Sequence, residues 1–348
     1  MRELRKDPVL NRWVIISTER GKRPLEPGKD YDHFSGFDPA RDPFKEGNEH
    51  LTPAEIYAVR PKGSQPNGPG WKVRVIPNKY PALKIEGDLN PKGYGLYDKM
   101  NGIGAHEVVI ESPDPFQQLH DLPLSSIVDV FNTFKLRIDD LSRDKRFAYV
   151  LAFKNHGQAA GASLRHSHSQ IIATPIVPKR VMEELYGAQA HWRVKRRSIF
   201  VDIVDQELLT QERIVFENEH MLAICPFAST SPFEIHIIPK RQQSDFRRAA
   251  IPEIQALSEA LKACLLKWQG AFGAAPYNFL LHTAPNDTDQ SGIRQEFPLL
   301  DAFYCWHIEM FPRLTRTAGF EWGTGYYINP TPPEEAAEFL REVKLEDL

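Results

Sequence analysis

The hydrophobic positions of this chain follow two different periods, which replace one another along its length. Short stretches of alternating or continuous apolar residues predict β-strands, at residues 71–85, 105–112, 147–157 and 166–174. Between the second and third of these stretches, apolar side chains recur three or four positions apart, at Ile127, Val130, Phe131, Phe134 and Ile138. That spacing predicts a helix over 124–141 with one buried face.

The same order recurs in the second part of the chain. Strands are predicted at 213–227, 232–241, 277–285 and 303–314, with a helix at 252–272. The pattern predicts an α+β fold of two tandem halves, each an antiparallel sheet with a packed helix. We place the halves at 1–178, which includes an irregular N-terminal arm, and at 179–348. Two unrelated α+β units with a chance likeness are the alternative.

Composition narrows the class of protein. A net charge of -3 and a pI near 6.5 argue against nucleic acid or an anionic membrane as the main partner. The cysteines, Cys225, Cys264 and Cys305, are far apart and odd in number, which favours a reducing compartment over a disulfide framework. The first residues contain no apolar signal segment. We therefore expect a soluble cytoplasmic protein.

The segment GASLRHSHSQ, residues 161–170, carries the strongest chemical signal. On an extended strand, residues two apart share a face, so His166, His168 and Gln170 would project together. Upstream, the Ser163 hydroxyl and the backbone N–H groups around Gly161 could meet a phosphate. An imidazole is largely neutral at pH 7, so an anionic diphosphate does not repel it. The segment predicts nucleophilic attack on phosphorus.

Around this segment the chain resembles the galactose-1-phosphate uridylyltransferase family, the nucleotidyltransferase branch of the histidine-triad superfamily. The resemblance covers nearly the whole chain and includes the following segments: LRKDPVLNRWVIISTERGKRP, EGNEHLTPAEI, VIPNKYPAL, NEHMLAICPFAS, LLHTAP and GFEWGTGYYINPTPPEEAA. It implies two histidine-triad-like halves in one subunit and homodimers that complete each other's sites. It also implies transfer of a nucleoside monophosphate between a nucleotide sugar and a sugar phosphate through a nucleotidyl-histidine.

The resemblance assigns roles to individual residues. His168 matches the nucleophile, and Gln170 matches the glutamine that holds the phosphoryl oxygens. Contacts to the nucleotide are implied for six further residues: Arg20, Arg23, Asn78, Asn155, Gly161 and Ser163. Without the resemblance, Ser163 and Asn155 could be turn formers, and the two arginines could be solvated charges.

The chain departs from the family at its metal ligands. Relatives with a structural zinc carry C-x-x-C where this chain has Asp42-Pro-Phe-Lys45, and their ligand histidine is Pro115 here. His166 would be the only remaining ligand, so we expect this zinc site to be lost. A second family site implies zinc or iron at Glu184, His282, Cys305 and His307. Glu183 is an equally near candidate there, and ordinary packed polar residues are the alternative.

Several functions stay open at this point. UDP-glucose and galactose 1-phosphate form the substrate pair that the family implies. Where the galactose enzymes carry a tyrosine and a glutamate that contact the sugar, this chain has Thr324 and Gly325. That form, and Ser167 between the two histidines, resemble the ADP-glucose phosphorylase relatives, which use phosphate as acceptor. A non-catalytic nucleotide-binding protein and a general nucleotide hydrolase are further alternatives.

Overall fold

The computed structural model describes residues 2–19, 37–288 and 291–344. Its centre is one ten-stranded sheet in the order β10-β11-β12-β14-β13-β8-β9-β7-β4-β3, and every pair of neighbours is antiparallel. The strands are β3 (Tyr57–Val59), β4 (Val73–Pro77), β7 (Ala105–Ile110), β8 (Tyr149–His156), β9 (His168–Thr174), β10 (Ile214–Glu217), β11 (Met221–Ile224), β12 (Ile235–Pro239), β13 (Tyr277–His282) and β14 (His307–Pro312).

The sheet repeats about its middle, where β8 pairs with β13. Outward from this junction, β9, β7, β4 and β3 of the first half match β14, β12, β11 and β10 of the second. Each half also has one long helix at the same point, α1 (Leu124–Leu141) and α4 (Ile251–Phe272). The α+β fold of two tandem halves predicted from the sequence is confirmed. The domain division at residue 178 stays a prediction, because the halves share one sheet.

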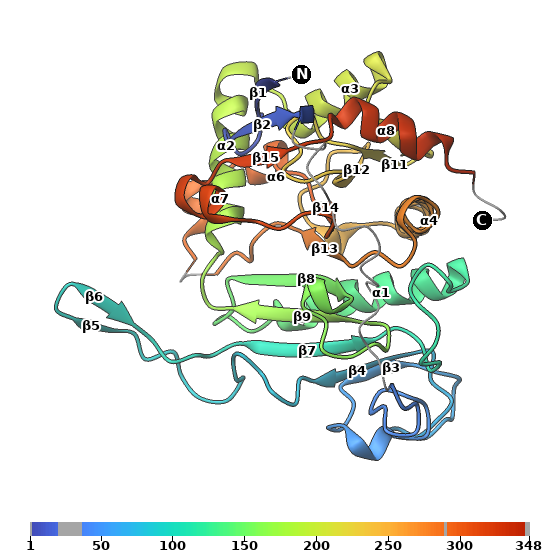
Figure 1. The fold of residues 1–348 in the computed structure, drawn as a ribbon. Helices are drawn as coiled ribbons and strands as arrows, with labels where there is room; N and C mark the ends of the chain where they lie inside the picture. The colour runs from blue at the N-terminus through green and yellow to red at the C-terminus, as the bar shows by residue number, and fades with distance from the viewer. Residues whose placement is uncertain (1, 20–36, 289–290, 345–348) are drawn as a thin grey trace.

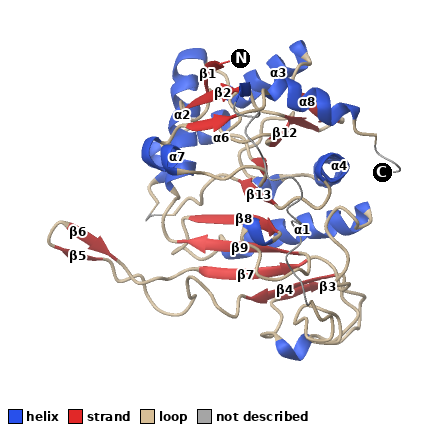
Figure 2. Ribbon diagram, viewed as in Figure 1, coloured by secondary structure: helices blue, strands red, loops and turns tan. Residues whose placement is uncertain are grey.

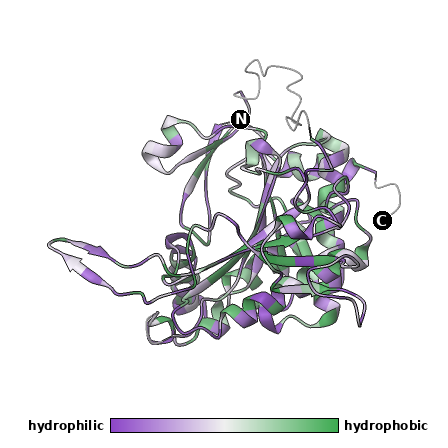
Figure 3. Cartoon of the chain, turned by 90° about the horizontal axis from the view of Figure 1, so that it is seen from below, coloured by the Kyte–Doolittle hydropathy of each residue, from purple (hydrophilic) through white to green (hydrophobic). Residues whose placement is uncertain are grey.

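The main core lies between the sheet and these two helices, which also pack against each other. The apolar residues of α1 at spacings of three and four are the buried ones: Ile127, Val130, Phe131, Phe134 and Ile138. Alternate residues of the strands, such as Val109 and Ile171, face the helices. Figure 3 shows apolar residues gathered where helices and strands pack. The residues between them on each strand face the opposite side, where the candidate chemistry lies.

The opposite side of the second half is covered by two helices, α2 (Lys179–Lys195) and α3 (Ile199–Thr210). Helix α3 packs on β10, β11 and β12 through Val204, Leu222 and Ile238. Figures 1 and 2 show these helices beside the N-terminal strands. The smaller elements are α5 (Ile293–Glu296), α6 (Leu300–Phe303), α7 (Gly319–Thr324), α8 (Pro333–Glu342), η2 (Glu49–Leu51), η3 (Gln158–Ala160) and η4 (Phe246–Arg248).

Both ends of the described chain meet at the second half. Strands β1 (Arg2–Lys6) and β2 (Trp13–Ser17) form a three-stranded sheet with β15 (Tyr327–Asn329), which runs parallel to β2. Arg5 binds Glu334 of α8 at 2.8 Å. The first residues, placed in the first half on sequence order, therefore pack with the second half. Between residues 2 and 344, outside the gaps at 20–36 and 289–290, no helix is both long and apolar enough to cross a bilayer.

Candidate active site

His168 is the first residue of β9, and its side chain is buried. Its Nδ1 lies 2.7 Å from the carbonyl oxygen of His166. A carbonyl oxygen can only accept, so Nδ1 carries the hydrogen and Nε2 is left with its lone pair. Nε2 makes no hydrogen bond with any residue that the structure describes. The ring is therefore fixed in one tautomer, with one nitrogen available for attack on phosphorus.

A buried ion pair lies behind this histidine. Lys154 of β8 donates from Nζ to Glu111 at 2.6 Å and to the carbonyl oxygen of His168 at 3.0 Å. Glu111 also accepts hydrogen bonds from the hydroxyls of Ser167 and Ser169, the two neighbours of His168. Burial acts to raise the pKa of Glu111, but the charge of Lys154 and the hydrogen bonds from Lys154, Ser167 and Ser169 together lower it. The network holds the backbone on both sides of His168.

His166 is turned away from open space. Its Nδ1 lies 2.6 Å from a carboxylate oxygen of Asp42, and its Nε2 lies 2.7 Å from the carbonyl oxygen of Ser112. The ring of Phe44 packs edge-on against both histidines, at centroid distances of 6.0 and 5.3 Å. Because both ring nitrogens of His166 are occupied, it positions the strand and offers no atom to a substrate. Asp42 is the side chain that holds Nδ1 of His166.

Gln170 is oriented by a second histidine. Its Oε1 lies 2.7 Å from Nε2 of His106, while Nδ1 of His106 accepts from the backbone N–H of Ala82 at 3.2 Å. The hydrogen of His106 is therefore on Nε2, and it is donated to Gln170. Neither N–H of the Gln170 amide donates a hydrogen bond to a residue that the structure describes. Asn78 adjoins this pair, with its Nδ2 3.2 Å from His106 Nε2.

The loop after β8 supplies further donors. Asn155 accepts from Asn278 at 2.7 Å through Oδ1, which leaves its amide NH2 for a ligand. Gly161 has φ +90°, which a residue with a side chain rarely adopts, and a Cβ added there would lie 3.6 Å from Asn155 Nδ2. Ser163 is exposed and forms no hydrogen bond with the described residues. Arg20 and Arg23 lie outside the described residues.

The acidity of His168 gives a testable pH dependence. Burial lowers its pKa to about 4, against the opposing effect of the hydrogen bond to the His166 carbonyl. The ring is protonated only below its pKa, so the attacking lone pair is present throughout the neutral range. We expect the rate of covalent labelling by a nucleotide sugar, followed by rapid quench, to stay constant from about pH 8 to about pH 5.5. A decline centred near the ordinary histidine value of about 6.5 would contradict this environment.

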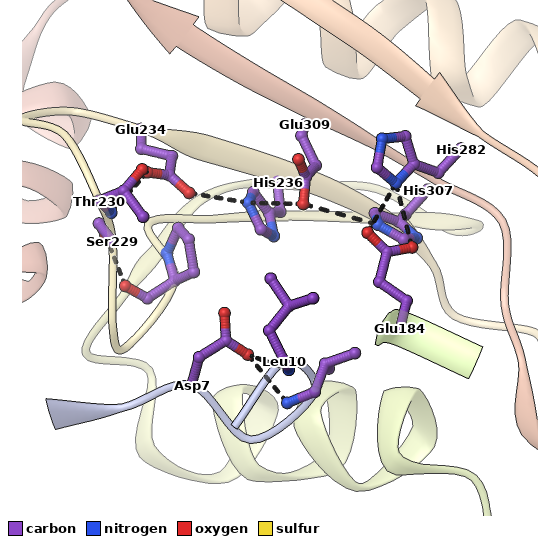
Figure 4. A network of polar contacts seen from close by, with 12 residues as sticks. Asp7, Leu10, Glu184, Ser229, Thr230, Glu234, His236, His282, His307 and Glu309 are labelled. Atoms are coloured by element: carbon purple, nitrogen blue, oxygen red, sulfur yellow. Dashed lines mark hydrogen bonds and ion pairs between the residues drawn. The ribbon is translucent and has the colours of Figure 1, made fainter. Parts of the chain in front are cut away.

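The second half contains the counterpart of this site. His307 begins β14 as His168 begins β9, and its Nδ1 donates to the carbonyl oxygen of Cys305 at 3.0 Å. Figure 4 shows His307 beside Glu184 of α2 and His282 of β13, with Glu309 next to it. One ligand atom from each of these four buried residues lies within 4.8 Å of the others. They form the group among the described residues that could hold a metal ion.

Our prediction of Cys305 as the fourth member is wrong, and Glu309 takes that place. On β14, residues two apart share a face, so Glu309 accompanies His307. Cys305 precedes the strand, and its side chain is buried among apolar residues including Leu185 and Phe303. Glu309 follows His307 at the spacing by which Gln170 follows His168. That spacing was the sequence signal for Glu309.

The charges of this group are balanced by buried partners. Arg180 donates to both oxygens of Glu309, at 2.6 and 2.8 Å, and His282 Nδ1 lies 2.8 Å from Glu184. Burial acts to lower the pKa of His282, but the charges of Glu184 and Glu309 raise it. Burial lowers the pKa of His307 to about 4, so its Nε2 keeps a lone pair at neutral pH. Carboxylates and a neutral imidazole suit a cation, and they repel a phosphate.

Comparison with known proteins places the chain. Residues 1–178, just over half of it, match the family described as galactose-1-phosphate uridyl transferase, N-terminal domain, and residues 129–345 match a domain of unknown function. The chain belongs to the galactose-1-phosphate uridylyltransferase family. The family resemblance predicted from the sequence is confirmed, and the chain is a member of a family of nucleotidyl-transferring enzymes.

Relatives within this family have two different names. ADP-glucose phosphorylase of Arabidopsis thaliana is 36% identical over 345 residues, which cover 99% of this chain and 93% of that relative. Galactose-1-phosphate uridylyltransferase of Thermotoga maritima is 33% identical over 356 residues, covering 99% of this chain and all of the relative. The crystal structure of the Arabidopsis ADP-glucose phosphorylase with bound ADP-glucose matches with a TM-score of 0.82 at 35% identity, over 99% of this chain and 100% of that chain.

Several residues of this uridylyltransferase-family site were missed in the sequence. His106 orients Gln170, but no motif in the sequence marked it for that role. Lys154 and Glu111 were not singled out. Their signal was present, because each places a charge inside or directly after an apolar strand pattern, where an unpaired charge would be costly. Two opposite charges of this kind in neighbouring strands indicate a buried pair.

Proposed function

We propose that this protein transfers an adenylyl group from ADP-glucose to inorganic phosphate through a covalent intermediate on His168. Nε2 of His168 would attack the α-phosphorus, and the bond from that phosphorus to the oxygen of glucose 1-phosphate would break. Phosphate would then attack the same phosphorus, releasing ADP and restoring the free imidazole. The unpaired Nε2 of a neutral, fixed ring is the observation that carries this proposal.

The transition state of each step needs donors for the nonbridging phosphoryl oxygens. His106 donates a hydrogen bond to Oε1 of Gln170, and this bond fixes the direction of the amide NH2. The amide of Asn155 is held in the same manner by Asn278. Such preorganised donors require little reorganisation during reaction and contribute about 3 kcal/mol each.

The residues at the positions where the galactose enzymes contact the sugar favour phosphate over a sugar phosphate as acceptor. Thr324 donates its hydroxyl to the carbonyl oxygen of Phe320 at 2.7 Å, and Gly325 has φ +71°. Both residues end the short helix α7 and offer no carboxylate or phenol to sugar hydroxyls. The second candidate is uridylyl transfer from UDP-glucose to galactose 1-phosphate, which the Thermotoga relative supports through its name.

A two-by-two assay separates the two reactions. The enzyme is incubated with ADP-glucose or UDP-glucose, each with either phosphate or galactose 1-phosphate, and the products are followed by chromatography. We expect ADP and glucose 1-phosphate to form fastest from ADP-glucose and phosphate. Preferred formation of UDP-galactose would establish the second candidate instead. Release of free nucleoside monophosphate without an acceptor would indicate a hydrolase.

We also propose a zinc or iron ion at Glu184, His282, His307 and Glu309. Two imidazoles and two carboxylates, with ligand atoms within 4.8 Å of one another, are a donor set that both metals accept. The group is buried, and Tyr304 and Arg180 hold the two carboxylates in place. The cation would stabilise the second half without entering the phosphoryl chemistry at His168.

Metal content tests this site directly. We expect His307→Ala to reduce the bound metal by at least about 10-fold in elemental analysis of the purified protein, because one of four ligands is removed. His50→Ala is the matched control, since His50 is exposed and lies outside the group. Equal metal content in wild type and His307→Ala would refute the proposed ligand.

A homodimer is the third part of the proposal. The hairpin of β5 (Lys92–Tyr94) and β6 (Tyr97–Lys99) projects from the body in Figures 1 and 3. Its tip exposes Tyr94, Leu96 and Tyr97, with Leu96 91% exposed. An isolated hairpin with an apolar tip is only marginally stable in water, which favours burial of this tip against a second copy of the chain.

The location of the protein in the cytoplasm stays a prediction.

Sedimentation velocity measures this assembly. We expect Leu96→Asp with Tyr97→Asp to convert a dimer into a monomer, because two charges would have to be buried at the interface. Leu209→Asp changes another highly exposed leucine, on α3, and should leave the dimer intact. A hairpin variant that sediments as wild type would exclude the hairpin from the interface.

A further inference from the structure

A cavity of about 490 Å³ lies in the second half, beside the proposed metal site. The turn between β1 and β2 forms one wall, helix α3 forms another, and β11, β12 and β14 form the floor. Its size is in the range of pockets that hold small organic ligands. Most of its walls are apolar, formed by side chains such as Val9, Leu10, Phe200, Ile203, Ile224 and Ile238.

The proposed metal ligands reach this cavity from one side. Glu184, His307 and Glu309 line it, whereas His282 does not. Figure 4 shows Leu10 across from these side chains. Nε2 of His307 has no hydrogen-bond partner in the described part of the chain, although the residue is only 3% exposed. An ion held by the group would therefore have protein behind it and the cavity in front.

The protein does not fully enclose such an ion. Three of its four ligands, Glu184, His307 and Glu309, line the cavity, so the ion would border free volume on that side. Both oxygens of Glu309 already accept hydrogen bonds from Arg180, which shares this carboxylate with the ion. Zinc can add a fifth ligand to four, so the free volume beside the group gives an external ligand room to bind the ion.

Charge selects the head group of that ligand. A divalent ion and the guanidinium of Arg180 place three positive charges beside the carboxylates of Glu184 and Glu309. One positive charge is left for an anion to neutralise. Further along the floor, Glu234 lies 3.0 Å from His236. Other charged side chains at the cavity are paired within the protein, as Asp7 is with Arg12 and Glu207 with Arg213.

We propose that the cavity binds an apolar monocarboxylate whose head group coordinates the ion held by Glu184, His282, His307 and Glu309. The inference rests on the metal site proposed above. The carboxylate supplies the single negative charge, and the alkyl body lies against Leu10, Ile203 and the other apolar walls. This pocket is separate from the nucleotide site at His168, because the two lie on different halves of the sheet.

Cobalt provides a direct readout, since its visible absorption changes when an inner-sphere ligand is added. The full-length protein is loaded with Co²⁺ and titrated with acetate, butyrate and hexanoate, and with hexylamine. We expect the spectrum to change with each carboxylate. Each buried methylene should tighten binding about fourfold, so hexanoate should bind about 16-fold more tightly than butyrate. Hexylamine should leave the spectrum unchanged.

Variants that fill the cavity test where the chain of the ligand lies. Leu10→Trp and Ile203→Trp are expected to weaken hexanoate binding by at least about 10-fold while cobalt stays bound, because an indole would occupy the volume of the alkyl chain. Leu209→Trp, an exposed site on the same helix as Ile203, should bind hexanoate as wild type does.

The outcomes separate the two proposals. Failure of the protein to bind cobalt would overturn the metal site and this inference together. Bound cobalt whose spectrum no carboxylate changes would overturn the inference alone and leave a closed metal site. A response independent of chain length, or a preference for hexylamine, would also overturn it, because the apolar walls or the charge of the site would then play no part.

Discussion

His168→Ala is expected to abolish nucleotidyl transfer, with a loss of at least about 10⁴-fold in kcat/KM. The substitution removes the nitrogen that would be bonded to phosphorus, and no neighbouring nitrogen can replace it. His166 is engaged on both ring nitrogens by Asp42 and Ser112. The measurement is denaturation-resistant radiolabel from ADP-glucose carrying ³²P in the α-position, together with steady-state product formation.

The control for this variant is the exposed histidine His50, which is outside the proposed site. His50→Ala should keep both the label and the turnover, and circular dichroism should show the same fold for all three proteins. Retained labelling of His168→Ala would show that another residue carries the nucleotide. Loss of turnover with full labelling would place the defect in the second step.

Lys154→Met is expected to lower the free energy of unfolding by about 3–5 kcal/mol. Lys154 and Glu111 are 1% and 0% exposed as side chains, so removal of the ammonium leaves a carboxylate buried without its counter-ion. The hydroxyls of Ser167 and Ser169 would remain as its partners, which is too little to replace a charge. Urea denaturation followed by fluorescence measures the change.

Two comparisons make this result specific to the buried pair. Lys154→Met combined with Glu111→Leu should recover part of the stability, since both charges are then absent. Arg143→Met removes the same type of partner from an exposed pair with Asp139 and should cost no more than about 0.5 kcal/mol. A loss as small in Lys154→Met as in Arg143→Met would mean that Glu111 finds another way to be neutralised.

Local patterns in the sequence were sufficient to predict the elements of the fold. The apolar spacing predicted a helix over 124–141, and α1 has these bounds. The helix predicted at 252–272 begins one residue earlier, at Ile251. Both predictions succeed because an amphipathic helix is specified by side chains within a few turns of one another. The repeat of the element order likewise predicted two halves of the same construction.

The sequence by itself also placed the proposed nucleophile and Gln170 side by side. His168 and Gln170 are two apart on one strand, and strand geometry alone puts them on one face. The same rule, applied to β14, would have selected Glu309 with His307 in place of Cys305. Cys305 was predicted instead because the prediction followed the family resemblance at a position where this chain departs from the family.

Only the tertiary structure decided which distant residues meet. Asp42 reaches His166 across 124 positions of sequence, and Lys154 reaches Glu111 across 43. The pairing of β8 with β13 joins the two halves into one sheet, and α2 brings Glu184 to His282. Periodicity states which face of an element a side chain occupies. It does not state which element lies opposite, because that choice depends on how all the elements pack together.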